Sequence, residues 1–236
     1  MGWAVLLLTT AVTAAPALVG ASDGQELGGN DLSAWRGDTG AWLVAGSATL
    51  DPANAKRLKT SAGGGVLVNG PEGQTSDLLS RLEHGDVEVH VEFMVPQGSN
   101  SGVYLQGRYE VQVFDSWGVE EPTFSDCGGI YQRWRSDEGF EGHPPGKNVS
   151  RPPGQWQRFD IVFRAPRFDA TGRKTANARF VKVVHNGVVV HEDVEVTGPT
   201  RAATYDDERP VGPLMLQGDH GPVAFRNIVV RAMTED

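Results

Sequence analysis

One stretch of the chain alternates so regularly that it restricts the protein to a β-rich fold. Residues 86–95, DVEVHVEFMV, place an apolar side chain at every second position from Val87 to Val95, with Glu and His residues between them. A period of two puts the apolar side chains on one face of a strand and the charged ones on the other. The sequence therefore predicts a strand with one face in a core.

Similar strands recur along the chain, and no window shows a sustained apolar period of 3.6. Residues 180–190, FVKVVHNGVVV, predict a hairpin, because Asn186-Gly187 supplies the positive φ angles of a type I′ turn. Thirty glycines and fourteen prolines suit short strands joined by tight turns. Further strands are predicted at 101–105, 109–114, 159–164 and 223–231. We therefore expect an all-β fold, a two-sheet antiparallel sandwich.

The first 22 residues have the pattern of a secretory signal. An apolar run from Trp3 to Leu8 is followed by small residues with Ala-rich cleavage points, although no lysine or arginine follows Met1. An uncleaved membrane anchor is the alternative, but threonines and Pro16 interrupt the stretch before it reaches a spanning length. We expect residues 23–236 to form a single exported domain, periplasmic or secreted, without membrane insertion after cleavage.

Charge and cysteine content exclude several function classes. The formal net charge is −9 and no segment concentrates lysine and arginine, so nucleic acid is not expected as a partner. Cys127 is the only cysteine, which rules out an intramolecular disulfide. No catalytic context surrounds Cys127, so a buried, inert thiol is the favoured interpretation over a nucleophile.

Three polar loops interrupt the predicted strands. The longest, 117–153, carries glycines, prolines, charges and several aromatic residues. A loop of that length inside a compact domain is usually functional. The second, 169–177, predicts a hairpin tip, and the third covers 200–209.

The densest polar segment is 100–116, NSGVYLQGRYEVQVFDS. If 108–115 is one strand, alternation places Arg108, Glu110 and Gln112 on the face opposite the apolar side chains. Such a row can be solvated decoration of an open sheet face or part of a site. Polar turns on both sides, with Trp117 as a ring that could stack on a sugar, favour a site.

The same segment, continued to Trp117, and CGGIY at 127–131 resemble the 3-keto-disaccharide hydrolase domain family. Further stretches that carry the resemblance are 31–35, 84–93, 148–169, 185–200 and 216–231. The resemblance implies a jelly roll of the concanavalin A type and action on glycosides oxidised to a ketone at C3. The loop between Arg133 and Lys147 departs most from the family pattern, so substrate detail there is open.

A C3 ketone acidifies the proton on C2. A base can then remove that proton and expel the C1 substituent, and hydration of the resulting enone completes a net hydrolysis. The resemblance also implies that some relatives use a divalent metal ion to stabilise the enolate, with ligands that the motifs do not place. It implies no nucleotide cofactor, and an oligosaccharide or glycoside as the partner.

The motifs suggest a role for each candidate residue. Glu110 is expected to be the general base or a metal ligand, and His220, in Gln217-Gly-Asp-His-Gly, the acid or a ligand. Gln112 and Arg108 would polarise or hold the substrate. His143 is a weaker metal or substrate candidate. The other expected substrate contacts are Asn100, Tyr104, Trp117, Tyr131, Asn148 and Arg151.

Glu110 has no second carboxylate beside it on its strand. A retaining glycosidase needs two carboxyl groups about 5 Å apart, and the position four residues after Glu110 is Phe114. A single base fits proton abstraction beside a carbonyl better. The rival interpretations are a non-catalytic, lectin-like carbohydrate-binding module and an ordinary glycoside hydrolase. On an open sheet face, Glu110→Gln is expected to change stability by at most about 0.5 kcal/mol.

Overall fold

The structure is a computed structural model that describes residues 24–233, and every regular element in this part is a strand. The predicted signal segment, 1–22, lies outside the described residues, and its cleavage and the export of the chain stay predictions. Within residues 24–233, no helix is long and apolar enough to cross a membrane.

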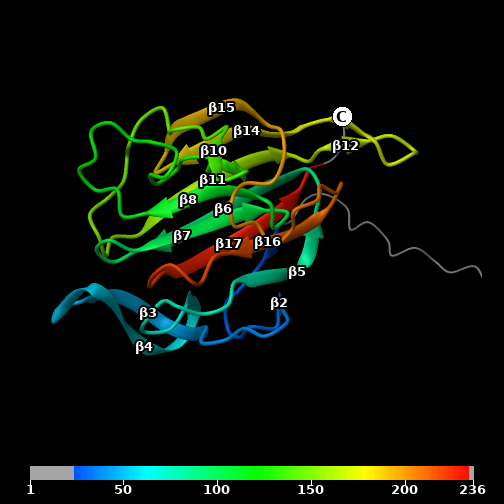
Figure 1. Ribbon diagram of the computed structural model, residues 1–236. Coiled ribbons are helices and arrows are strands. Elements are labelled where there is room, and N and C mark those ends of the chain that lie inside the picture. Colours follow the sequence, from blue (N-terminus) through cyan, green and yellow to red (C-terminus); the bar gives the residue numbers. More distant parts are fainter. Residues whose placement is uncertain (1–23, 234–236) are drawn as a thin grey trace, which may run out of the picture.

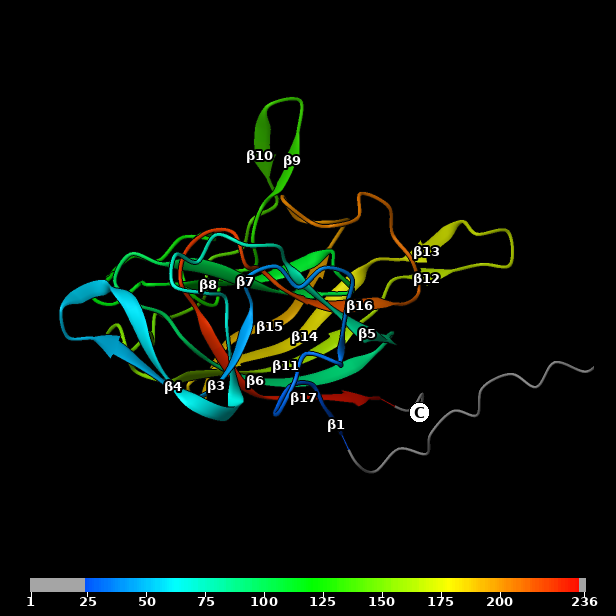
Figure 2. The same cartoon turned by 90° about the horizontal axis from the view of Figure 1, so that it is seen from below.

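Two antiparallel sheets lie one over the other as a sandwich (Figures 1 and 2). The larger has the order β15 (Val188–Val196), β14 (Ala178–His185), β11 (Gln157–Arg164), β6 (Val87–Met94), β17 (Ala224–Ala232), β4 (Asn54–Val68) and β3 (Leu43–Asp51), and β1 (Gln25–Glu26) pairs with β17. The smaller has the order β2 (Trp35–Arg36), β5 (Leu78–His84), β16 (Gly212–Leu216), β7 (Asn100–Leu105) and β8 (Tyr109–Phe114). The predicted two-sheet antiparallel sandwich is confirmed.

The core fills the space between the two sheets. On β6, the predicted alternation holds, and the side chains from Val87 to Phe93 at every second position are buried. They belong to one apolar cluster with Val111 and Val113 of β8. Burial of each large apolar side chain contributes roughly 1.5–3 kcal/mol, so the inward faces of β6 and β8 fix which side chains point outward. Cys127 is buried in the same core.

The predicted turn between β14 and β15 is present. Asn186 has a φ of 50° and Gly187 a φ of 84°, both in the left-handed region that a type I′ turn needs. His185 pairs with Val188 on either side of the turn. This hairpin forms one edge of the larger sheet.

The longest strand pair, β3 with β4, is not predicted by the alternation argument. It extends away from the rest of the larger sheet in Figure 1, and most of β4 is exposed, with only its last three residues buried. Its exposed part, NAKRLKTSAGGG, is polar on both faces, so no period of two marks it.

The long segment between β8 and β11 has local structure. It contains the hairpin of β9 (Arg133–Arg135) and β10 (Glu138–Phe140), which stands away from the body of the molecule in Figure 2. The other predicted hairpin tip, 169–177, contains β13 (Lys174–Ala176), which pairs with β12 (Arg167–Phe168), so only its first five residues form the tip. The Asn148 side chain braces the start of the long segment by donating to the carbonyls of Ser116, at 2.7 Å, and Val119, at 2.9 Å.

Candidate active site

A polar cavity of about 300 Å³ opens on the outer face of the smaller sheet, over β7 and β8. This volume lies at the lower end of the range for small-molecule sites, roughly 300–1,000 Å³. Six of the ten residues predicted as site residues line it, together with three others. The lining residues are Asn100, Tyr104, Glu110, Gln112, Tyr131, Arg201, Ala202, Gln217 and His220. We call this space the Glu110 cavity.

The register of β7 and β8 brings the central groups together. Tyr104 pairs with Glu110, and Gly102 pairs with Gln112. Because paired residues on antiparallel strands point to the same face, the phenol, the carboxyl and the carboxamide project outward into one cavity. The intervening side chain of Val111 points into the core.

Glu110 is buried, not on the open sheet face that the sequence suggests. It is only 2 % exposed, because the loop after β15 and the segment after β8 cover the sheet here. The pKa of Glu110 is raised to about 8, mainly by burial and also by the nearby charges of Asp77 and Asp219, while hydrogen bonding with Tyr104 opposes the rise. No lysine or arginine in the described part of the chain forms an ion pair with this carboxyl.

Gly102 makes room for that carboxyl. A Cβ at this position would overlap the Glu110 carboxylate and stand 2.7 Å from Cε2 of Tyr104, and real Cβ atoms essentially never come so close to a heavy atom. The side chain of Glu110 therefore occupies the space that any other residue at position 102 would fill.

Tyr104 supplies a hydroxyl beside Glu110. Burial, with the neighbouring Glu110 carboxylate, raises the pKa of Tyr104 well above its usual value. Its hydroxyl donates to the Arg201 carbonyl over a long 3.4 Å. Tyr104 therefore stays a phenol near neutral pH, and its hydroxyl can donate a hydrogen bond.

Gln112 is fixed at the cavity wall. Its Nε2 donates to Oδ1 of Asn100 and to the carbonyl of Ser125, both at 3.2 Å. Neither bond uses Oε1 of Gln112. Tyr131 lies nearby because its backbone N–H donates to the Glu110 carbonyl at 3.2 Å.

His220 enters the cavity from the loop after β16. Its Nδ1 hydrogen bonds to Oδ1 of Asp219, and both side chains are about half exposed. Asp77, the residue before β5, accepts a 2.8 Å hydrogen bond from the N–H of Gly218, and burial raises the pKa of Asp77, as does the charge of Asp219. Additional carboxylates therefore come from other elements, which alternation along β8 could not show.

Three lining residues were not predicted as site residues. Arg201 places its guanidinium over the ring of Trp134, 4.0 Å from the centroid. Ala202 has a φ of 63°, a conformation that costs energy for a residue with a Cβ. Gln217 donates its N–H to the Gly102 carbonyl at 3.0 Å. The predicted polar loop at 200–209 contains the first two, but no motif there signals a site.

Arg108 does not line the cavity. It precedes β8 in a turn, and its guanidinium donates to the Asp207 carbonyl and carboxylate and to the Gln106 carbonyl. It also lies over the ring of Tyr205, 4.5 Å from the centroid. The strand begins at Tyr109, so the assumed alternation from position 108 does not apply, and Arg108 anchors the loop that follows β15.

Three further predicted contacts also lie elsewhere. Trp117 is 58 % exposed in the loop after β8 and does not line the cavity. The carboxamide of Asn148 bonds only to the backbone: its Nδ2 donates to the two carbonyls named above, and its Oδ1 accepts from the N–H of Ser150. Arg151 lines a different cavity, on the outer face of the larger sheet.

The residues of the Glu110 cavity do not fit a metal site built from the usual strong ligands. Within residues 24–233, no three His, Cys, Asp or Glu side chains are grouped so that they could hold a metal ion. His143, the weaker candidate, has its backbone paired with Ile130 and does not line the cavity. The divalent metal stays a prediction of the resemblance.

The fold that carries this cavity is also found in known proteins. Two crystal structures of candidate glycosyl hydrolases from Parabacteroides distasonis ATCC 8503 resemble the structure. One is 28 % identical with a TM-score of 0.66, and the match covers 90 % of this chain and 84 % of that one. The other is 19 % identical with a TM-score of 0.57, covering 90 % of this chain and 100 % of that one, and shows the fold alone.

A search of curated proteins found no match to the chain. The model of a carbohydrate-active family, the 3-keto-alpha-glucoside-1,2-lyase-like domain, matches residues 24–231. This match spans every strand described above but the end of β17, and it includes every residue of the Glu110 cavity. The chain belongs to the family of 3-keto-alpha-glucoside-1,2-lyase-like domains.

Proposed function

We propose that the protein is an enzyme that cleaves 3-keto-glycosides by elimination, with Glu110 as the base. The observation that carries the proposal is a buried carboxyl without a cationic partner, whose pKa is raised to about 8, at the wall of a polar cavity. General bases work best when their pKa lies near the working pH. Strongly shifted acids in cavities are also typical of functional sites.

The reaction needs one proton removed and one bond broken. The Glu110 carboxylate takes the proton from C2, and the C2–H electrons form an enolate with the C3 ketone. The enolate electrons then form the C1=C2 double bond while the C1–O bond breaks, and the leaving oxygen takes a proton to become an alcohol. Addition of water to the enone at C1, with return of a proton to C2, gives the 3-keto sugar as the product of net hydrolysis.

Other residues of the cavity supply the remaining proton and orient the substrate. Tyr104 keeps its proton and lies beside Glu110, so it can donate a hydrogen bond to the developing enolate oxygen. The exposed His220, oriented by Asp219, is the candidate acid for the leaving oxygen. Gln112 and Asn100 hold the sugar, because their mutual bond fixes both carboxamides at the wall.

The neighbourhood of Asp77 and Asp219 keeps an ordinary glycoside hydrolase as a second candidate. Both charges act on Glu110, so the argument from a missing second carboxylate is weaker in the structure than along the strand. A carbohydrate-binding module is less well supported. Burial disfavours ionisation of the Glu110 carboxyl, and a protein that only binds sugar does not need an acid with a raised pKa.

The test compares 3-keto-glucosides with their unoxidised parents, each with and without a chelator. We expect aglycone release and a transient enone absorbance only with the oxidised substrates, at a rate that rises with pH up to about 8, because Glu110 must be ionised to act as a base. Release from unoxidised parents without an enone would replace the proposal with ordinary hydrolysis. Binding of the sugar without release from either substrate would replace it with a binding module.

A further inference from the structure

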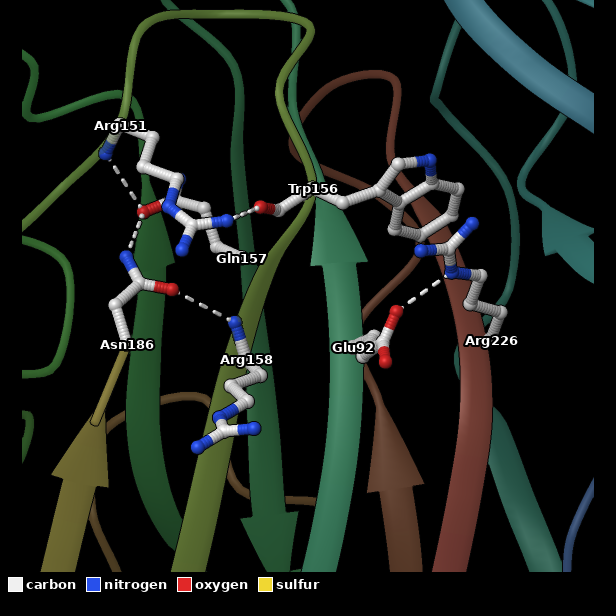
Figure 3. A pocket seen from close by; sticks show the side chains of 7 residues that line it. All are labelled: Glu92, Arg151, Trp156, Gln157, Arg158, Asn186 and Arg226. Atoms are coloured by element: carbon white, nitrogen blue, oxygen red, sulfur yellow. Dashed lines mark hydrogen bonds and ion pairs between the residues drawn. The ribbon is translucent and has the colours of Figure 1, made fainter.

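A second polar cavity lies on the outer face of the larger sheet. Its volume is about 390 Å³, and Figure 3 shows the side chains that line it, Glu92, Arg151, Trp156, Gln157, Arg158, Asn186 and Arg226. The inward residues of these strands join the same core as the inward residues of β8. The two cavities therefore open on opposite outer faces of the sandwich, and one ligand cannot touch both.

The centre of the second cavity is a row across three neighbouring strands. Glu92 of β6 pairs in register with Arg158 of β11 on one side and with Arg226 of β17 on the other. The cavity is lined by three arginines and one glutamate, a formal surplus of two positive charges in a chain whose net charge is −9. We call this space the arginine pocket.

Glu92 does not neutralise all three arginines. Its carboxylate accepts from Nε of Arg226 at 2.6 Å and from Asn227 at 3.0 Å. Although burial acts in the opposite direction, hydrogen bonds from Asn227 and Arg226 hold the pKa of Glu92 below its usual value. Both oxygens of the glutamate are therefore engaged on the side of the pocket formed by β17.

Arg151 and Arg158 keep charge available for a ligand. The guanidinium of Arg151 donates to the Trp156 carbonyl at 2.7 Å, and no acidic side chain in the described part of the chain forms an ion pair with it. Nε of Arg158 forms an ion pair with Oδ2 of Asp160 at 3.4 Å, but Asp160 is shared with Nδ1 of His90 at 2.6 Å, and the Arg158 side chain is about half exposed, so its charge is only partly balanced. The N–H of Arg151 and the amide of Asn186 both donate to Oε1 of the buried Gln157, so the loop that carries Arg151 is fixed to the strand below.

The pocket lacks a free aromatic face for a neutral sugar. The guanidinium of Arg226 lies over the Trp156 ring, 4.0 Å from the centroid, as Figure 3 shows. Trp156 also packs against a small apolar cluster that includes Met94 and Ala224. Recognition here must therefore come from charge, and planar guanidinium groups pair with carboxylates and other oxyanions through two parallel hydrogen bonds.

We propose that the arginine pocket is a second ligand site that binds an oxyanion, the chemistry that a sugar carboxylate and a phosphate group share. Arg151 and Arg158 donate to the oxyanion, while Glu92 and Trp156 hold Arg226 at the edge. The site is separate from the Glu110 cavity, so the assignment holds whether or not the chain cleaves 3-keto-glycosides.

The test is calorimetric titration of the full protein with sodium glucuronate, with inorganic phosphate and with glucose, at low salt. We expect saturable binding of glucuronate, no binding of glucose, and weaker binding at high salt. The variant Arg151→Gln/Arg158→Gln should weaken glucuronate binding about ten-fold or more, since each arginine makes charge-assisted hydrogen bonds. Glu110→Gln should leave glucuronate binding unchanged.

Arg231→Gln is the matched control, because Arg231 lies on the same sheet face, outside the arginine pocket, and pairs with Glu88 at 3.0 Å. Melting temperatures verify folding, and single Arg158→Gln serves if the double variant unfolds. Phosphate binding with the same dependence on Arg151 and Arg158 supports the site and, if tighter, moves the ligand to phosphorylated compounds. The proposal fails if wild type binds neither anion, if glucose binds equally well, or if Arg231→Gln weakens binding as much.

Discussion

The Glu110 cavity and the arginine pocket lie on opposite outer faces of one sandwich, and they differ in how an acidic side chain is surrounded. Around Glu110 the protein buries an acid, leaves it without a cation, and pushes its pKa toward 8. Around Arg226 it places an acid between two arginines and holds the pKa of Glu92 below its usual value. The same residue type is buried without a cation on one face and paired with arginine on the other.

Removing the carboxylate from the first face should have the largest effect. Glu110→Gln is expected to lower turnover of a 3-keto-glucoside by about 10²–10⁴-fold, the usual cost of losing a general base. Glu92→Gln is the control, because it removes a carboxylate of the same kind from the other face. Steady-state rates of both variants give the answer, and equal losses would abolish the contrast between the two faces.

Crowding the Glu110 carboxyl should have the next largest effect. Gly102→Ala places a methyl group where the carboxylate now lies, and a displacement of about 1 Å can cost about 10²-fold in rate. Gly146→Ala is the matched control, since its Cβ would meet only the Val190 carbonyl at an ordinary 3.4 Å. Normal turnover of folded Gly102→Ala protein would show that the position of this carboxyl does not matter.

The buried acid should also have a measurable effect on stability. Below about pH 4.5 Glu110 is protonated in both the folded and the unfolded chain, and between pH 4.5 and 8 only the folded chain keeps the proton. Folding therefore loses stability as pH rises across this window, and the loss is complete above pH 8. Glu110→Gln avoids it, so its free energy of unfolding should exceed that of wild type by roughly 4 kcal/mol at pH 8.

Thermal or denaturant unfolding at pH 4.5 and pH 8 measures this difference. At pH 4.5 the two proteins should be nearly equal. A difference independent of pH would mean that packing, not ionisation, separates Glu110 from glutamine at this position.

The smallest expected effect lies at the edge of the Glu110 cavity. Trp134 is 43 % exposed and supports the Arg201 guanidinium. Trp134→Ala removes this support, worth about 0.5–2 kcal/mol, and should raise KM several-fold with kcat little changed. Trp117→Ala, an exposed tryptophan outside the cavity, should leave both constants as they are. A fall in kcat alone would place Trp134 nearer to the chemistry than the structure does.

Strands with a local sequence signal could be predicted, and strands without one could not. The bounds of β8 and the turn of β14–β15 were predictable, because alternation and the Asn-Gly dipeptide are local signals. The β3–β4 pair was not, because its exposed part is polar on both faces. Alternation also placed Glu110 and Gln112 on the correct face of β8.

The remaining parts of the site depend on contacts between distant segments. Arg201 lines the cavity from the loop after β15, and the charge of Asp77 acts on Glu110 from the residue before β5. Nothing in the sequence around either residue indicates this. The burial of Glu110 likewise comes from segments that cover the sheet, so its raised pKa could not be predicted from β8. Arg108 was placed by extending the strand one residue into a turn, where Gln106 and Gly107 have positive φ angles.

The pairing of Tyr104 with Glu110 has a consequence for how a preparation of this protein is judged. A slip of β8 by one residue against β7 would turn Val111 and Val113 to the outside and bury Glu110 among apolar side chains. Such a misfolded chain would keep its strand content but have no Glu110 carboxyl in the cavity. Under the proposed mechanism, specific activity therefore measures the fraction of correctly paired molecules in a sample, which a far-ultraviolet spectrum cannot measure.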